Sequence, residues 1–439
     1  MKKFCVSFLF LLISIFVFSN DMYLIDQGGK GIAKSGMVVA STNSGIALYY
    51  NPAGLANVNT RDLELNASLI LPNLSYSSQD GTKYDAAKKG NIPVSIFYTH
   101  PLNEKITLAL GITTPVFKND QWENSFPGRF FTSQYEIRTN ELSLGLGYKL
   151  TEKINVGFSV DYSSTYLKFS NFFKSPYYDY LTGTDELIGY FEVKGGIDDT
   201  QTDTGFTVGI QYNFLPKWTL GFSYKTEKDF DFKNVPVSFE QITEVGFSNA
   251  EESFNRLFGN LNETLTTKFQ IPSQFAIGVA YRPTNRWLIE VDYLSLSTSD
   301  NDVINFDYSI NNDSIIDRGY SKKWDDMSLY GFSLEYTATK KIKIMGAMRY
   351  GSDVIPLDDW HPAVANGEMF WISLGISYLD QGNGFEFAMF FKNYKDYVVS
   401  GQEYTFSPIG EGYLELLQDA TGKYDRNFVG FTYSYHIRF

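Results

Sequence analysis

Residues 429–439 read V-G-F-T-Y-S-Y-H-I-R-F. Apolar and aromatic side chains take every second position, namely Val429, Phe431, Tyr433, Tyr435, Ile437 and Phe439. Small or polar residues stand between them. Successive side chains of a strand point to opposite faces of the sheet, so this alternation is typical of a strand with one apolar face.

The same alternation recurs through most of the chain. Fourteen segments carry it, at 62–71, 91–100, 105–115, 134–149, 153–169, 202–214, 217–232, 270–283, 286–299, 325–338, 341–351, 369–380, 383–397 and 425–439. The links between them alternate between very short turns and long loops, the longest at about 170–201, 233–269, 300–324 and 398–424. Short turns at one end and long loops at the other are typical of bacterial outer-membrane barrels.

Because lipid cannot hydrogen-bond a free strand edge, such a sheet has to close. The sequence therefore predicts an all-β fold, a 14-stranded antiparallel transmembrane β-barrel spanning 61–439. A soluble β-sandwich is the alternative, but its outward faces should be polar and its strands about 5–6 residues long.

Composition excludes several other classes. The 439 residues are 43% hydrophobic and 17% aromatic, with 37 Lys+Arg against 50 Asp+Glu and a net charge of −13. A nucleic-acid binder should carry a basic face, so no nucleic-acid partner is expected. A disordered chain would be poor in aromatic residues. The mean hydropathy of −0.21 is too low for a bundle of membrane-spanning helices.

Residues 1–19 have the features of a secretory signal peptide. Lys2 and Lys3 precede an apolar run from Phe4 to Phe18, and Ser19 offers a small residue for cleavage. A single anchoring helix is the alternative, although the run is shorter than the ~20 residues needed to span a bilayer. Cys5 is the only cysteine, so the processed chain should contain no disulfide, catalytic thiol or cysteine-bound metal.

Residues 20–60 do not alternate, and their glycines and alanines indicate a compact plug, or hatch, inside the barrel. A phosphate-binding loop would need a preceding strand and Gly-Lys-Ser/Thr spacing, which this segment lacks. The Asn51-Pro52 pair is a natural turn starter, because Asn can bond its own backbone and Pro fixes φ.

The run Asn51-Pro52-Ala53-Gly54-Leu55-Ala56 resembles the hatch signature of FadL-type outer-membrane transporters of long-chain fatty acids and aromatic hydrocarbons. The resemblance continues through most of the chain, in 111–117, 272–283, 324–336 and 349–356. It implies a plugged fourteen-stranded barrel that captures substrate outside and releases it sideways at an inward-kinked third strand. It further implies hatch and gating roles for Asn51, Pro52 and Ala53, and places Gly111 and Pro115 on the lateral-opening strand.

Lys30 and Lys34 depart from an otherwise small-residue hatch and leave the polarity of the expected pocket open. An ordinary turn into the first strand is the alternative for Asn51-Pro52.

Two outer loops offer a landing place for an apolar ligand. Residues 251–267 carry apolar side chains at helical spacing, which predicts an amphipathic helix. We expect a low-affinity ligand groove between this helix and the 170–201 loop, formed by Phe172, Phe173, Tyr177, Phe254, Leu257, Phe258, Leu261 and Leu265. Simple packing of the helix onto the neighbouring loop is the alternative.

Enzyme and metal patterns are weak. The chain has three histidines, His100, His361 and His436, and none stands at a local metal-ligand spacing. Ser434 and His436 share one strand face, but side chains two apart point in parallel and do not converge on a substrate. We therefore expect no enzyme, no catalytic residue, no metal site and no cofactor.

The function favoured by the sequence is passive uptake of long-chain fatty acids or other hydrophobic small molecules across the bacterial outer membrane. Outer-membrane lipid and lipopolysaccharide are the expected surroundings, and the protein is expected to be a monomer. The alternative is a non-transporting barrel that acts as a surface receptor or as a scaffold of an envelope or secretion complex. Substrate identity, calcium binding by outer loops and a carboxylate-binding basic residue cannot be read from the sequence.

Overall fold

The computed structural model describes residues 26–87, 90–130, 132–179, 186–242, 254–255, 264–300, 303–308, 318–321, 324–355, 367–381, 383–399, 403–406, 416–419 and 421–439. No helix within these ranges is both long and apolar enough to cross a membrane.

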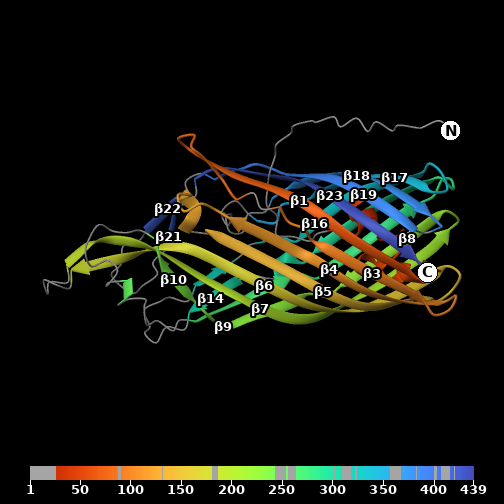
Figure 1. Ribbon diagram of the computed structural model, residues 1–439, viewed down its shortest axis with the longest axis horizontal. Coiled ribbons are helices and arrows are strands. Elements are labelled where there is room, and N and C mark those ends of the chain that lie inside the picture. The colour runs from red at the N-terminus through yellow and green to blue at the C-terminus, as the bar shows by residue number, and fades with distance from the viewer. Residues whose placement is uncertain are drawn as a thin grey trace, which may run out of the picture.

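The dominant element is a closed antiparallel barrel, formed in the described residues by fourteen long strands (Figure 1). Its strands are β1 Asp62–Ser78, β3 Val94–Pro101, β4 Ile106–Gln121, β5 Gln134–Lys149, β6 Ile154–Asp179, β7 Glu186–Leu215, β8 Trp218–Lys225, β12 Gln274–Tyr281, β13 Trp287–Leu296, β16 Met327–Thr337, β17 Ile342–Gly351, β18 Met369–Asp380, β19 Asn383–Tyr394 and β23 Gly422–Arg438. The barrel closes where β1 pairs with β23 over the whole length of β1, from Asp62↔Arg438 to Ser78↔Gly422. The predicted fold class is confirmed.

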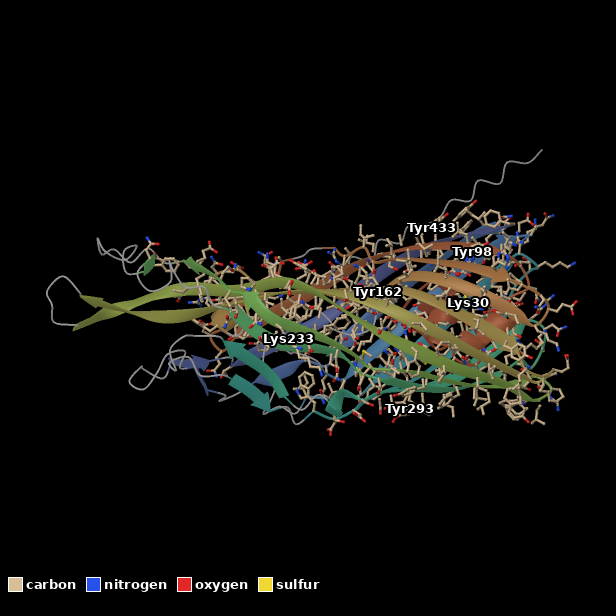
Figure 2. All side chains as sticks on the ribbon, turned by 90° about the horizontal axis from the view of Figure 1, so that it is seen from below. Lys30, Tyr98, Tyr162, Lys233, Tyr293 and Tyr433 are labelled. Carbon is tan, nitrogen blue, oxygen red and sulfur yellow. The ribbon has the colours of Figure 1, made fainter. Side chains whose placement is uncertain are left out.

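The barrel has an apolar exterior and a polar interior, as the alternation requires. Outward side chains such as Leu144, Val291 and Leu374 are more than half exposed, with 60%, 58% and 57% of their surface accessible. Tyr293 and Tyr433 lie at opposite edges of the barrel in Figure 2. These exposed apolar faces are consistent with contact to lipid.

Shorter elements sit at the loop end. A separate sheet joins β9 Lys228–Pro236, β11 Thr264–Ile271, β14 Val303–Tyr308 and β15 Arg318–Ser321. The remaining short elements are β2 Lys83–Asp85, β10 Ser238–Gln241, β20 Tyr397–Val399, β21 Glu403–Phe406, β22 Leu416–Asp419, η2 Pro127–Phe130 and η3 Thr298–Asp300.

Two outer segments differ from expectation. The segment at 170–201, predicted as a long outer loop, is strand in its described residues, because β6 and β7 continue as a paired ribbon from Ser170↔Gly196 to Asp179↔Glu186, with a register shift between Tyr177 and Tyr178. Figure 1 shows this ribbon projecting beyond the barrel. The helix predicted over 251–267 is wrong at its end, where 264–267 belongs to β11. Leu265 pairs with Val235 of β9, and three threonines in this stretch favour a strand.

The hatch lies inside the barrel, near the end that carries the short turns (Figure 1). It contains three short helices, α1 Gly29–Ala33, α2 Ala47–Tyr50 and the 3₁₀ helix η1 Pro52–Asn57. Nearly all of its described side chains are buried. Asn51 begins η1: its Oδ1 accepts a hydrogen bond from the Ala53 amide at 3.1 Å, and Pro52 occupies the first helical position.

Glycines on the barrel wall make room for η1. A Cβ atom at Gly157 would overlap the backbone of Pro52 and Ala53, and one at Gly209 would overlap Asn51 Oδ1. The wall and the hatch are therefore in backbone-to-backbone contact at these two strands, β6 and β7.

We predict that Gly157→Val leaves the barrel folded but loosens the hatch. Overpacking of this kind costs about 1–3 kcal/mol, so the hatch should open to protease roughly ten- to a hundredfold more often. Trypsin cleavage after Lys30 and Lys34 in detergent-purified protein measures this opening. Gly346→Val is the control, because the nearest wall atom to a Cβ there is the flexible Leu374 Cδ2 at 3.2 Å. Equal cleavage of the two variants would contradict the prediction.

Candidate functional site

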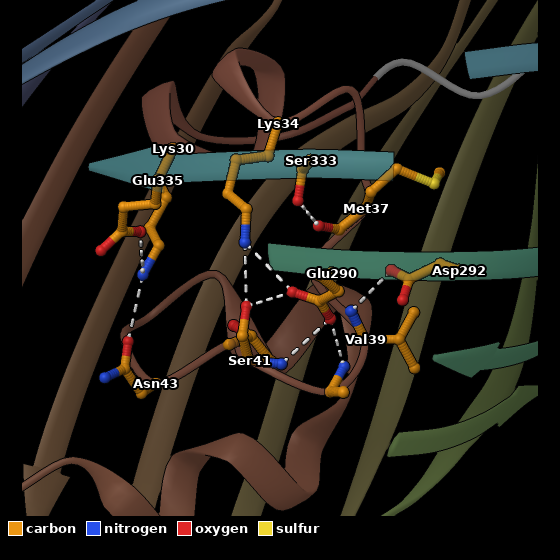
Figure 3. A network of polar contacts seen from close by, with 12 residues as sticks. Lys30, Lys34, Met37, Val39, Ser41, Asn43, Glu290, Asp292, Ser333 and Glu335 are labelled. Atoms are coloured by element: carbon orange, nitrogen blue, oxygen red, sulfur yellow. Dashed lines mark hydrogen bonds and ion pairs between the residues drawn. The ribbon is translucent and has the colours of Figure 1, made fainter. Parts of the chain in front are cut away.

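The hatch is held to the wall by carboxylates of β13 (Figure 3). Glu290 Oε2 accepts a hydrogen bond from Lys34 Nζ at 3.1 Å and another from the Ser41 hydroxyl. Glu290 Oε1 accepts from the amides of Ala40 and Ser41 at 2.6 and 3.1 Å. Lys34 and Glu290 are both fully buried. This carboxylate therefore binds one charge and two backbone groups of the hatch at once.

Neighbouring contacts extend the same anchoring. Asp292 Oδ2 accepts a hydrogen bond from the Val39 amide at 3.1 Å. Lys30 Nζ lies 3.6 Å from Glu335 Oε2 and 3.2 Å from Asn43 Oδ1. Both hatch lysines thus form ion pairs with carboxylates of the wall.

A cavity of about 60 Å³, which opens into a larger solvent-accessible space, lies between the hatch and the wall. Apolar side chains make up part of its lining, namely Ala276, Leu294, Leu296, Met327, Leu329 and Met369. Among them stand three cationic residues, Lys225, Arg349 and Lys392, together with Asp26 and Asp292. The cavity is therefore amphipathic, as expected for a pocket that orients a ligand by a few polar groups.

The cations of the cavity are held by defined contacts. Arg349 makes a two-pronged ion pair with Asp26, at 3.1 and 3.3 Å. Lys225 Nζ lies 3.6 Å from Glu141 Oε1 and 4.3 Å from the centre of the Tyr49 ring. Lys392 Nζ lies 5.0 Å from the centre of the Trp371 ring. These three side chains are the cationic groups that a bound anion would meet in the cavity.

The alternation of β4 breaks in its middle. Thr113, Thr114, Pro115 and Val116 are all buried in succession, and the register to β5 shifts between Thr113 and Val116. The pairing of β3 with β4 ends at Ile96↔Ile112. An irregularity of this kind bends a strand; Pro115 lies within this kink and Gly111 precedes it.

Gln27 links the cavity to the kink. Its side-chain Nε2 donates to the Thr114 carbonyl at 3.1 Å, and its amide donates to Tyr50 Oη at 2.7 Å. Tyr50 lines the cavity, and so does Asp26, which precedes Gln27 in the chain. Leu48 approaches the kink from the hatch as well, because a Cβ at Gly111 would lie 2.8 Å from its Cδ2. The first turn of the hatch thus stands between cavity and kink.

The three hatch residues predicted to gate the channel, Asn51, Pro52 and Ala53, lie against β6 and β7 and not against the kink of β4. Asn51 Nδ2 donates to the carbonyls of Val39 and Ile210, at 2.7 and 3.2 Å. Pro52 and Ala53 face Gly157 of β6. The contacts that reach the kink directly in the described residues come from Gln27 and Leu48, whereas Asn51 fixes the hatch to itself and to β7.

The predicted ligand groove falls only partly within the described residues. Phe172 and Leu265 are buried, the latter in an apolar cluster with Val116 and Phe230. Phe173 and Tyr177 belong to β6, and Phe254 is half-buried. Leu257, Phe258 and Leu261 lie outside the described residues, so the groove stays a prediction.

The arrangement matches a known family. The family model of outer membrane protein transport proteins (OMPP1/FadL/TodX) matches residues 10–438. The chain belongs to this family. It is therefore an outer membrane β-barrel of a family of transport proteins for hydrophobic compounds.

Solved structures of similar fold include members of the OMPP1/FadL/TodX family. A FadL homologue of Pseudomonas aeruginosa gives a TM-score of 0.78 at 14% identity, over 95% of this chain and 99% of the other. The toluene transporter TbuX of Ralstonia pickettii gives 0.65 at 15% identity, over 95% and 99% of the two chains. At these identities the likeness shows the fold alone.

A curated relative is a putative outer membrane protein of Neisseria meningitidis serogroup B. It is 26% identical over 86 residues, which are 17% of this chain and 18% of the relative. The match thus covers less than a fifth of that protein.

Several side chains of the site were not predicted from the sequence. Glu290, Asp292 and Glu335 lie on the inward face of their strands, a position that the alternation of 287–293 already fixes for the first two. Two carboxylates two residues apart on a lumen-facing strand were the available signal. Asp26 and Gln27 carried no comparable pattern, since they precede the first helix of the hatch.

We predict that Glu290→Gln destabilises the hatch strongly. Removing one partner of a buried pair leaves Lys34 as an uncompensated buried charge, which costs about 3–5 kcal/mol. Hydrogen exchange of the 34–43 amides should rise accordingly in the folded barrel. The control is Asp380→Asn, which removes the half-exposed partner of Lys341 and should cost about 0–1 kcal/mol. Unchanged exchange in the Glu290 variant would contradict the anchoring role.

Proposed function

We propose that this protein takes up long-chain fatty acids and related hydrophobic molecules with an acidic head group, and that it does so passively. The observation that carries the proposal is the amphipathic cavity beside the hatch. Its apolar wall suits an acyl chain, while Arg349, Lys225 and Lys392 suit a carboxylate. A receptor or scaffold has no need of such a cavity.

The energetics favour a passive route. Long acyl chains enter an apolar medium with a gain of about 0.8 kcal/mol per buried CH₂, so their barrier at the cell surface is the charged lipopolysaccharide layer. A protein that bridges this layer and releases the ligand into the membrane needs no energy source. On this proposal the ligand moves downhill throughout.

The proposed route leaves the lumen sideways at the kink of β4. The ligand would be captured at the outer loops, pass to the cavity, displace the segment around Gln27 and leave beside Thr114. Asn51, Pro52 and Ala53 would act in gating by holding the rest of the hatch in place. We propose that the protein works as a monomer and without a cofactor.

We predict that joining Gln27→Cys to Thr114→Cys with a short, reducible thiol-specific crosslinker blocks uptake. The bond would hold the first turn of the hatch against the kink, so uptake of a labelled long-chain fatty acid should fall to that of a deletion strain. Reduction should restore it. Processed protein would have no other cysteine if residues 1–19 are removed.

The matched control crosslinks Ser35→Cys to Ser373→Cys, whose hydroxyl oxygens are 2.8 Å apart on the opposite side of the hatch. This pair should leave uptake unchanged. Full crosslinking of the Gln27 pair without loss of uptake would contradict the route. Equal uptake in wild-type and deletion strains would contradict transport itself and favour the receptor or scaffold alternative.

We predict that the double variant Asp26→Asn, Arg349→Met distinguishes acids from hydrocarbons. It removes the cation without leaving its buried partner charged. Because hydrogen bonds to charged groups contribute about 1.5–3 kcal/mol, fatty acid affinity should fall about ten- to a hundredfold. Binding of an alkane of the same chain length should not change. Titration of both ligands into purified protein measures the ratio, and equal losses would contradict a head-group role.

A further inference from the structure

A second cluster of ionisable side chains lies at the seam where the barrel closes. It joins Glu64 of β1, Glu386 of β19 and His436 of β23, three strands that neighbour one another. Glu64 and His436 are direct partners in the β1–β23 register. Each of the three side chains is at least nine-tenths buried, with 1%, 4% and 4% of its surface exposed. None of them takes part in the route proposed for the ligand.

The donor atoms of this cluster converge. One atom from each side chain, all within 4.8 Å of one another, can face a common point. His436 Nε2 and Glu386 Oε2 are 3.7 Å apart. Two ligands of a tetrahedral zinc ion with bonds of about 2.1 Å are separated by about 3.4 Å. The spacing is therefore close to that of a bound ion.

The converging atoms also lack other partners. Within the described residues, both carboxylate oxygens of Glu64, Glu386 Oε2 and His436 Nε2 are buried with no hydrogen-bond partner. Buried polar atoms in native proteins are nearly always hydrogen-bonded, and exceptions require an explanation such as an ion. Here the unpartnered atoms belong to the same three residues and point to the same place.

The other ring nitrogen of His436 has the partner that a metal-bound histidine usually has. Nδ1 lies 3.4 Å from Asp62 Oδ2. A carboxylate that accepts from Nδ1–H fixes the tautomer in which Nε2 carries a lone pair for a metal. Asp62 would thus orient the imidazole without binding the ion itself.

Charge balance points the same way. Asp62, Glu64 and Glu386 bring three carboxylates together around one imidazole. Two lysines, Lys30 and Lys343, also act on Glu386, but both share the carboxylate of Glu335. Even a protonated His436 would leave a net negative charge among buried groups, whereas a divalent cation would neutralise two carboxylates.

The hatch closes the cluster from the lumen side. The Gly29 amide donates to Ser434 Oγ at 2.8 Å, two residues from His436 on the same strand face. A Cβ atom at Gly28 would lie 2.9 Å from Glu64 Oε1, and one at Gly29 would lie 3.0 Å from Glu386 Oε2. Glycine at both positions lets the hatch backbone come down directly onto the carboxylates.

From these observations we propose that Glu64, Glu386 and His436 form a binding site for a zinc-class divalent transition metal ion. Imidazole together with carboxylate favours zinc and its neighbours, whereas calcium and magnesium prefer oxygen ligands alone. An ion at this point joins β1, β19 and β23 under the first turn of the hatch. It thereby fastens the seam of the barrel.

The test measures metal binding directly on the full chain in detergent. After chelator treatment and dialysis, the protein is titrated with ZnCl₂ by calorimetry, and bound zinc is counted by elemental analysis after gel filtration. We expect one zinc ion per chain and little competition from excess Ca²⁺ or Mg²⁺. Co²⁺ in place of zinc should give the absorption bands of a site with a nitrogen ligand.

Three variants assign the site. His436→Gln and Glu64→Gln should each lose stoichiometric zinc, and Asp62→Asn should weaken binding by about 10- to 100-fold. His100→Gln is the matched control, because it removes a histidine of β3 that bonds Tyr98 Oη of the same strand and lies away from the cluster. This variant should keep one zinc ion. Heat-modifiable migration on gels checks that each barrel is folded.

Wild-type protein that binds less than one zinc ion per chain would overturn the proposal. So would full binding by the His436 variant, or preferential binding of calcium. If a variant fails to fold, the zinc stoichiometry and the Co²⁺ spectrum of the wild type still decide the question.

Discussion

The sheet has to close on itself, and this requirement determines where every other group of the protein can lie. Lipid offers no hydrogen bond to a free strand edge, so β1 has to pair with β23 along its length. Closure turns one face of every barrel strand toward lipid and the other toward a lumen. The apolar groups then lie outside, and the charged groups have to be accommodated within. An acidic, aromatic-rich composition is the result of this inversion.

The charges of a barrel lumen are met either by water or by a chain segment that can satisfy them. The hatch does so with backbone amides and two lysines, because its small residues bring the main chain close to the wall. Glu290 receives Lys34 and two amides, while Gly157 and Gly209 admit η1. Removing one partner of a buried pair is costly, so the loss of any one of these wall groups should disturb the position of the hatch.

The alternation was enough to predict the barrel and its strand number, because both are written in local sequence. The continuation of β6 and β7 beyond the membrane was not, since 170–201 lacks a clear apolar period and becomes a ribbon only by pairing with itself. Leu265 fits a helical spacing locally, but pairing with β9 places it in a strand. Local ligand spacing likewise said nothing of His436, whose partner Asp62 lies 374 residues away and meets it only through closure.

Anchoring of the hatch is unequal, and this bears on how a ligand can pass. The segment at 39–41 is bound to the carboxylates of β13, and Gly29 is bound to Ser434 on β23. Gln27, by contrast, meets the kink through a side-chain amide and a neutral carbonyl of Thr114. Hydrogen bonds between neutral groups contribute about 0.5–1.5 kcal/mol, less than those to charged groups. On the proposed route a ligand has to replace this contact, whereas Asp26 beside it is paired with Arg349 and Gly29 is bonded to Ser434, so displacement of the Gln27 side chain is the least that passage requires.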